Sequence, residues 1–223
     1  HVAARRLGSE AAARSLLARL SESGAEAVLL IGGDVREPAG PYRSSFDLLR
    51  TGLLQTAGFR KFGVAGYPEG HPGIDDGMIR ENLALKLDYA SNEGLDVFIV
   101  SQFCFEGPVI TEWVKQLRVR GIAVPVRVGV AAITYLAMLL ELGLRCGVGN
   151  SIRALRGKMG SMVQLVAAHE PQDVIQDIAA ACLAGLSPGT LSVHLFAFGG
   201  AGMTARWMEK IAGGASESDS GGK

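Results

Sequence analysis

The chain has 223 residues, 48% of them hydrophobic, with 22 Lys and Arg against 22 Asp and Glu. The balanced charge removes the usual electrostatic case for nucleic acid or an anionic membrane as a partner. The three cysteines lie far apart without zinc-type spacing, so we expect buried thiols in a reducing, cytoplasmic compartment, with no metal site and no disulfide framework. Glycines and a proline interrupt the long uncharged stretch near the C-terminus, which excludes a single membrane helix there.

A unit of helix, glycine and apolar strand recurs along the chain. In chain order, the pattern predicts a helix at Ser9–Ser23, a strand at Ala27–Ile31, a helix from about Ser44 to Gly58, a strand at Phe62–Gly66, a helix from about Asp76 to Gly94, a strand at Asp96–Val100, a helix at Pro108–Arg120, a strand at Val124–Val128, a helix from Pro171 to Gly185 and a strand at Leu191–Phe196. A glycine just past a helix supplies the left-handed conformation that ends it. Continuous apolar runs are typical of strands buried on both faces.

Some segments fit this repeat less well. Further helical signal appears at Thr134–Leu142 and Ser151–Met159, and the low-complexity tail Gly213–Lys223 is expected to be disordered. Pro125 weakens the prediction of its strand, because proline cannot donate to the ladder. Ser44 to Asp47 fits a capping box that opens a helix.

The repeat, with a period of roughly 30–40 residues, indicates parallel βα units in either a doubly wound sheet or a closed barrel. The pattern predicts five strands, whereas a closed (β/α)8 barrel has eight. In both architectures, ligand-binding residues gather at the carboxyl ends of the strands. The sequence contains no Gly-rich dinucleotide fingerprint, no Walker lysine and no nucleophile elbow.

Three of the predicted strand ends carry side chains suited to a ligand. Gly33 and Asp34 follow the first strand, where a tight turn with Asp34 as a loop cap is the simpler interpretation of this motif alone. Tyr67 and His71 follow the second strand and would present an aromatic face and an imidazole to one planar ligand, although a lone His near a strand end is more often structural. Gln102 follows the third, with an amide suited to the edge of a heterocycle or, equally, to a capping role in the loop.

Taken in order, these strand ends resemble the methylenetetrahydrofolate reductase family. The match rests on Gly33-Asp34 after a buried strand, Ser44-Ser45-Phe46-Asp47-Leu48, Gly66-Tyr67-Pro68-Glu69-Gly70-His71-Pro72 and Ser101-Gln102-Phe103-Cys104-Phe105-Glu106, and it covers about residues 1–210. The resemblance implies a TIM (β/α)8 barrel that holds FAD at the carboxyl ends of its strands. It also implies an oxidoreductase of one-carbon metabolism and methionine biosynthesis, which moves a hydride from NAD(P)H through the flavin to 5,10-methylenetetrahydrofolate and gives 5-methyltetrahydrofolate.

The resemblance assigns roles to individual residues. The residues that would contact FAD are His1, Gly33, Asp34, Ser45, Tyr67, His71 and Lys86. The residues that would contact the substrates are Asp34, Gln102 and Phe196, with Gln102 binding either the pterin or the nicotinamide. Asp34 would also be the catalytic residue, because a carboxylate near the flavin pyrimidine disfavours negative charge on the reduced ring and so tunes its potential.

Several positions depart from the family pattern. The family's first two strands, most of its third and its general-acid Glu are expected before His1, so we expect residues 1–212 to be a partial barrel from a longer chain, followed by a disordered tail at 213–223. Gly32 and Gly200 stand where the family has arginines, and the loop after Val128 differs. These changes leave two alternatives open: a non-catalytic folate-binding barrel, or the same chemistry run oxidatively in folate-linked demethylation. A barrel also exposes apolar helix faces that would allow a homo-oligomer.

Overall fold

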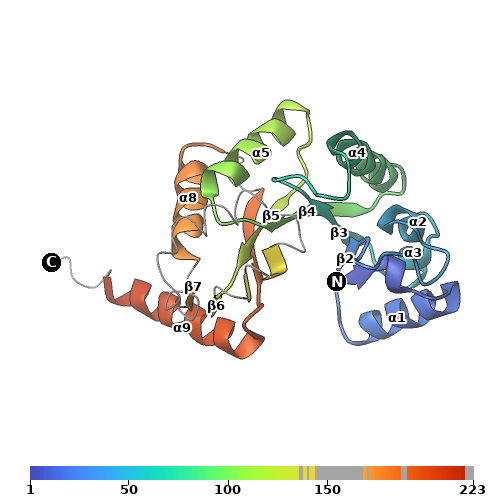
Figure 1. Cartoon of the computed structure of the whole chain (residues 1–223), viewed down its shortest axis with the longest axis horizontal. Helices are drawn as coiled ribbons and strands as arrows, with labels where there is room; N and C mark the ends of the chain where they lie inside the picture. The colour runs from blue at the N-terminus through green and yellow to red at the C-terminus, as the bar shows by residue number, and fades with distance from the viewer. Residues whose placement is uncertain (136–137, 140, 144–167, 170, 187–189, 219–223) are drawn as a thin grey trace. The chain divides into compact units, whose positions relative to one another are not determined.

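The computed structural model describes residues 1–135, 138–139, 141–143, 168–169, 171–186 and 190–218, and among them six strands form one sheet (Figure 1). The strands are β1 (Val2–Ala3), β2 (Val28–Ile31), β3 (Lys61–Gly66), β4 (Asp96–Phe103), β5 (Val126–Ala131) and β8 (Leu191–Phe196), in the order β1-β2-β3-β4-β5-β8. Strands β1 to β4 pair in parallel. The chain divides into two compact units, one of His1–Ser101 with Ile122–Arg127 and one of Gln102–Gly121 with Val128–Lys223.

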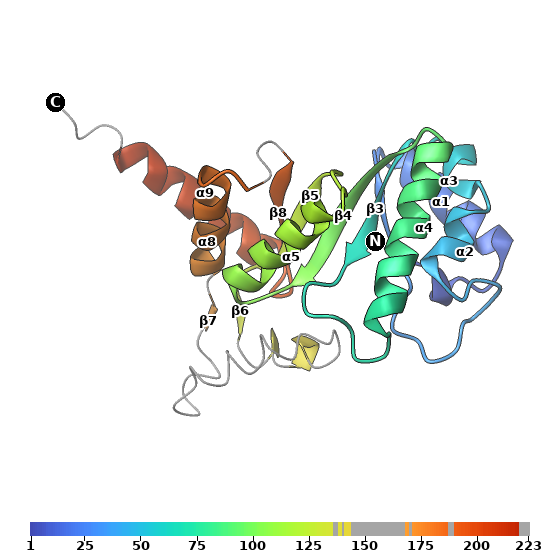
Figure 2. The same ribbon diagram turned by 90° about the horizontal axis from the view of Figure 1, so that it is seen from above.

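The first unit packs helices against strands that are buried on both faces. Its helical segments are η1 (Ala4–Arg6), α1 (Glu10–Glu22), α2 (Ser45–Leu49), α3 (Leu53–Thr56) and α4 (Asp76–Asn92). α4 packs alongside β3 (Figure 2). The parallel register sets Leu30 beside Val64 and Val64 beside Ile99, and all three side chains are fully buried. Successive strand residues point to opposite faces, so the consecutive buried residues of β3 and β4 mean that both faces are covered.

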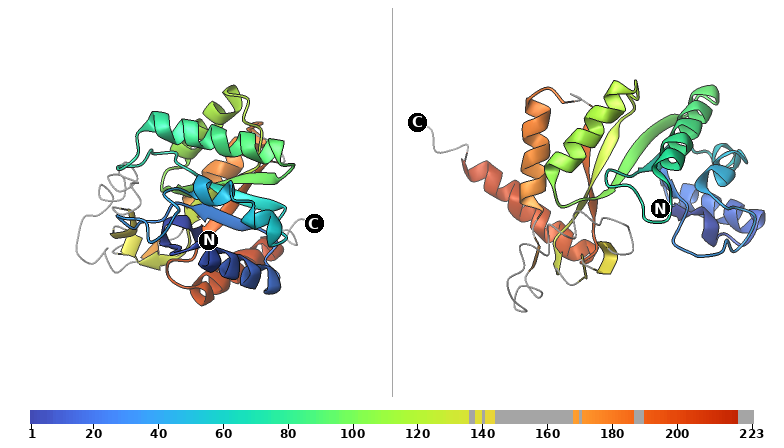
Figure 3. Two further views of the ribbon diagram at one scale, coloured as in Figure 1. Left: turned by 90° about the vertical axis from the view of Figure 1, so that its right-hand side faces the viewer. Right: turned by 45° about the horizontal axis from the view of Figure 1, so that its top comes forward.

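The second unit contains α5 (Gly107–Val119), α8 (Gln172–Leu183), α9 (Ala201–Ser218), β8 and the carboxyl-terminal parts of β4 and β5. α5 and α8 lie side by side (Figure 3). The buried residues of α5 include Ile110, Val114 and Leu117, whose spacing places them on one helix face. β6 (Thr134–Tyr135) and β7 (Ala168–His169) form a separate antiparallel pair.

Several predicted elements are confirmed. β8 has the predicted bounds, and α1 lies within the predicted range, with the Ser9 hydroxyl accepting a hydrogen bond from the Ala12 N–H at 3.1 Å. The capping box is also confirmed. The Ser44 hydroxyl accepts from the Asp47 N–H at 3.2 Å, and the Asp47 carboxylate accepts from the Ser44 N–H at 2.9 Å.

Two predicted boundaries are wrong because of a glycine and a proline. The single helix expected from Ser44 to Gly58 is two short helices, since Gly52 adopts φ +71° between them and a left-handed residue interrupts an α-helix. β5 begins at Val126, which leaves Pro125 outside the strand, where its carbonyl accepts from the Ile99 N–H at 2.8 Å.

Other differences concern where elements begin and end. β4 continues to Phe103, so Gln102 belongs to the strand and not to the loop after it. Thr134 begins the short strand β6, so the first part of the helix predicted at Thr134–Leu142 is wrong, whereas residues 138–139 and 141–143 are helical, as predicted for the later part. The helix predicted at 151–159 lies outside the described residues. α9 runs to Ser218, so part of the segment for which we expected disorder is helical.

The predicted α/β class with a parallel sheet is confirmed, while the closed barrel is not. Among the described residues the sheet is open, with β1 and β8 at the two ends of the strand order. The division into a barrel at 1–212 and a tail at 213–223 stays a prediction. No helix in the described part of the chain combines the length and the apolar character that crossing a membrane requires.

Candidate functional site

The turn after β2 is shaped by close contact with the neighbouring strand. Gly33 adopts φ +97°, and a Cβ added there would lie 3.1 Å from the Ala3 Cβ and 4.0 Å from the Arg6 Cγ. The Arg5 N–H donates to the Gly32 carbonyl at 2.9 Å and so extends the pairing of β1 with β2. Glycine is therefore required at position 33 for its backbone conformation and for its distance from β1.

Asp34 forms an ion pair with a residue that sequence reasoning missed. The Arg6 guanidinium donates to the Asp34 Oδ1 from Nη2 at 2.5 Å and from Nε at 3.2 Å. The two side chains are 58% and 49% exposed, so the pair lies at the surface where β1 and β2 end. The rule that found Asp34 would also have found Arg6, had the two-residue strand Val2–Ala3 been recognised.

Tyr67 and His71 lie together after β3, as predicted. Their rings meet edge to face, with centroids 5.6 Å apart and an interplanar angle of 82°. A turn joins them, closed by a hydrogen bond from the Gly70 N–H to the Tyr67 carbonyl at 3.2 Å. Both residues are half-buried.

The protonation of His71 follows from its surroundings. The His71 Nδ1 accepts a hydrogen bond from the Gly73 N–H at 3.1 Å, which places the proton of the neutral imidazole on Nε2. Burial lowers the pKa of His71 below its ordinary value of 6.5. At neutral pH this side chain is therefore a neutral imidazole that donates from Nε2.

Ser45 and Lys86 come from two helices that pack together. Ser45 is 5% exposed at the start of α2, and Lys86 is half-buried on α4. The helices meet through Phe46 and Tyr89, whose ring centroids are 6.1 Å apart. Burial lowers the pKa of the Lys86 ammonium group. His1, in contrast, is exposed and directly precedes β1.

Gln102 and Phe196 lie in the second unit, next to a cluster of aromatic side chains. Phe196 stacks on Phe198 with centroids 5.5 Å apart and an interplanar angle of 7°, and Phe103 meets Phe198 edge to face at 5.0 Å. Phe103 is buried, whereas Phe105, Phe196 and Phe198 are half-buried. Gln102 precedes Phe103 on β4 and is also half-buried. An amide and a partly exposed aromatic wall suit a planar heterocycle.

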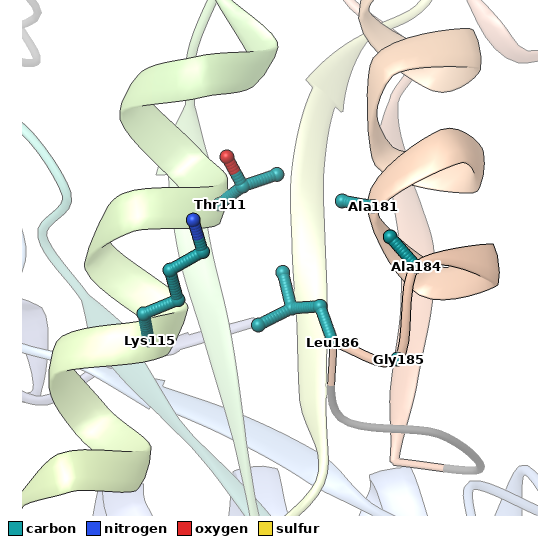
Figure 4. Close-up of a pocket in the computed structure, with 6 residues that line it drawn as sticks. All are labelled: Thr111, Lys115, Ala181, Ala184, Gly185 and Leu186. Atoms are coloured by element: carbon teal, nitrogen blue, oxygen red, sulfur yellow. The ribbon is translucent and has the colours of Figure 1, made fainter.

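A separate hollow of about 360 Å³ lies between α5 and α8 (Figure 4). It is lined by Thr111, Lys115, Ala181, Ala184, Gly185 and Leu186. None of these residues belongs to a strand end or to the predicted site, so the hollow is a groove between two surface helices and not part of the candidate site.

The structure thus brings together some of the predicted site residues. Asp34 lies in the turn with Gly33, and Tyr67 contacts His71, all in the first unit. Phe196 and Gln102 lie in the second unit. The predicted site residues of the first unit include a carboxylate and a neutral imidazole, and those of the second unit include the Gln102 amide; groups of these kinds can hold and orient polar ligands.

Comparison with known proteins identifies related sequences. A family model described as methylenetetrahydrofolate reductase matches residues 6–157. The chain is 34% identical over 126 residues to methylenetetrahydrofolate reductase 1 of Schizosaccharomyces pombe, an alignment that covers 52% of this chain and 20% of that protein. It is 28% identical over 129 residues to methylenetetrahydrofolate reductase 2 of Saccharomyces cerevisiae, covering 53% and 21%. The chain therefore spans about a fifth of the length of these curated relatives.

Proposed function

Because the chain belongs to the methylenetetrahydrofolate reductase family, we propose that it is part of a flavin-dependent oxidoreductase that interconverts 5,10-methylenetetrahydrofolate and 5-methyltetrahydrofolate. The observation that carries this proposal is the family match over residues 6–157, which includes Asp34, His71 and Gln102. For the whole protein we propose NAD(P)H as the second substrate, a cytoplasmic location and a closed (β/α)8 barrel whose general-acid Glu lies outside this chain.

Several residues of the first unit offer hydrogen-bond donors of the kind that would bind FAD. The neutral His71 imidazole offers Nε2–H, and Tyr67 and Ser45 offer hydroxyl groups. These donors suit the phosphate and ribityl oxygens of FAD. Lys86 would add positive charge toward the diphosphate. His1 and the backbone at Gly33 complete the set of residues that we propose to hold the cofactor.

Bound FAD would carry the hydride between NAD(P)H and the folate. Within this chain, Asp34 would place a carboxylate next to the flavin and the pterin. Gln102 would orient the pterin or the nicotinamide through its amide, which has a donor and an acceptor side by side. Phe196, with Phe198 stacked on it, would cover the aromatic part of the folate and exclude water from it.

The proposal is tested with the full-length protein purified in its flavin-bound form. We expect a yellow protein whose flavin absorbance bleaches anaerobically with NADH or NADPH and returns on addition of 5,10-methylenetetrahydrofolate. His71→Ala should raise the dissociation constant of FAD on the order of tenfold, because one hydrogen bond to a charged group is lost. The control Arg14→Gln removes an exposed residue of α1 that forms an ion pair with Glu10, and it should leave FAD binding unchanged.

Two outcomes would contradict the proposal. A colourless full-length protein that takes up no added FAD would reject a flavin enzyme. Tight tetrahydrofolate binding by that same protein, without oxidation of NAD(P)H, would instead support the non-catalytic folate-binding barrel.

A further inference from the structure

We propose that Arg6 is a positioning residue that holds the Asp34 carboxylate and offsets its negative charge beside the flavin, so that the bound flavin is easier to reduce. This inference rests on the proposed function, because it needs FAD near Asp34. The observation behind it is the ion pair between these two residues, which joins the ends of two adjacent parallel strands.

The side chain of Arg6 lies across the turn that carries Asp34. Its Cγ is 4.0 Å from the point where a Cβ on Gly33 would stand, and its Nη2 and Nε both donate to Oδ1 of Asp34. Two donors on one oxygen fix the orientation of the carboxylate more closely than one donor would. The carboxylate that would face the flavin is therefore held by the preceding strand.

The backbone around Arg6 is itself tied to the loop after β2. The Arg5 N–H donates to the Gly32 carbonyl at 2.9 Å, and the Ala39 N–H donates to the Arg5 carbonyl at 2.8 Å. The Arg5 guanidinium also donates to the Arg36 carbonyl at 2.6 Å. These bonds join η1 to both sides of the turn, so the backbone segments that carry Arg6 and Asp34 are held beside each other independently of the contact between the two side chains.

An exposed ion pair of this kind contributes little to the stability of the fold. The charge of Arg6 does matter to a ligand beside Asp34. A carboxylate alone would disfavour added electron density on a nearby flavin, whereas a carboxylate paired with a guanidinium presents little net charge. The pair should therefore favour the half-reactions that reduce the flavin, by NAD(P)H or by 5-methyltetrahydrofolate, over the one that reoxidises it.

The test measures the midpoint potential of FAD bound to the full-length protein, together with its thermal stability. Arg6→Gln should move the potential to more negative values and lower the equilibrium constant for flavin reduction by 5-methyltetrahydrofolate on the order of tenfold. Asp34→Asn should move the potential in the opposite direction. The double variant removes one charge of each sign, so its potential should return close to that of the unmodified protein.

Two further variants distinguish an effect of the Arg6 charge on the flavin potential from an effect of a lost ion pair on the fold. Arg6→Lys keeps the positive charge, so the midpoint potential of the bound FAD should stay close to that of the unmodified protein. Arg14→Gln breaks a comparable exposed ion pair to Glu10, with 3.0 Å between Nη2 and Oε1, and should leave the potential unchanged. An unchanged potential in Arg6→Gln, with FAD still bound, would overturn this inference alone. Failure of the unmodified protein to bind FAD would overturn the proposed function and this inference with it.

Discussion

Replacing Gly33 with alanine tests whether the turn that carries Asp34 is fixed by its contact with β1. Two costs are expected. Alanine at φ +97° occupies a conformation that disfavours a side chain by about 1–2 kcal/mol. The new Cβ would also lie 3.1 Å from the Ala3 Cβ, closer than ordinary van der Waals contact, which adds about 1 kcal/mol as overpacking.

Gly24 provides a matched control in the same unit. It adopts φ +83° just past α1, and a Cβ there would meet nothing within 4 Å. Gly24→Ala should therefore lower the free energy of unfolding by about 1–2 kcal/mol, the backbone cost alone. Gly33→Ala should lower it by about 2–3 kcal/mol, and the difference between the two variants measures the contact with Ala3.

Urea denaturation followed by circular dichroism gives the free energy of unfolding of each variant, provided that the dependence of this free energy on urea concentration is the same in both. Adding Ala3→Gly to Gly33→Ala should recover about 1 kcal/mol, because it removes the atom that the new methyl group meets. Equal losses in Gly24→Ala and Gly33→Ala would refute the contact argument. No loss in either variant would refute the argument from backbone conformation.

Three further predictions concern α2, His71 and Lys86. Ser44→Ala should lower the free energy of unfolding by about 1 kcal/mol in urea denaturation, because the Asp47 N–H loses its cap; an unchanged value would mean that α2 needs no cap. Burial lowers the pKa of His71, so the unfolded chain binds more protons, and stability should fall as pH decreases from about 6.5. His71→Gln should reduce the slope of the free energy of unfolding against pH on the acid side. An identical slope would contradict the assignment of this pH dependence to His71. Burial likewise lowers the pKa of Lys86, so Lys86→Met should keep or raise thermal stability while weakening FAD binding. A clear loss of stability would contradict the argument from burial, and unchanged FAD binding would contradict a role in binding.

Much of the fold was predictable because its signals are local. A helix followed by glycine and a continuous apolar run marks each βα unit, and the strand Leu191–Phe196 was placed correctly from that pattern alone. The break at Gly52 was missed, since nothing in the neighbouring sequence distinguishes a glycine that ends a helix from one that splits it. The strand predicted at Asp96–Val100 continues to Phe103 in the structure, although Ser101 and Gln102 are polar.

The site was less predictable because its contacts are set by strand register. Tyr67 and His71 are close in sequence, and their approach follows from one turn. Arg6 and Asp34 are 28 residues apart and meet only because β1 and β2 pair with Ala3 beside Ile31. A pattern of residue types at strand ends names the candidates, but it does not say which partner each of them has.

The arginines of η1 beside this turn also change how the glycine at position 32, a departure from the family pattern, should be interpreted. The resemblance places an arginine of the family at the position of Gly32, which implies the loss of one potential FAD contact there. In the structure, a Cβ on Gly32 would lie 3.9 Å from the Arg5 Cδ, so the stem of an arginine from the neighbouring segment already lies there. The next residue, Arg6, contacts Asp34 directly. The positive charge at this turn is therefore supplied by Arg6 of η1, and we expect that the glycine at position 32 does not by itself prevent FAD binding.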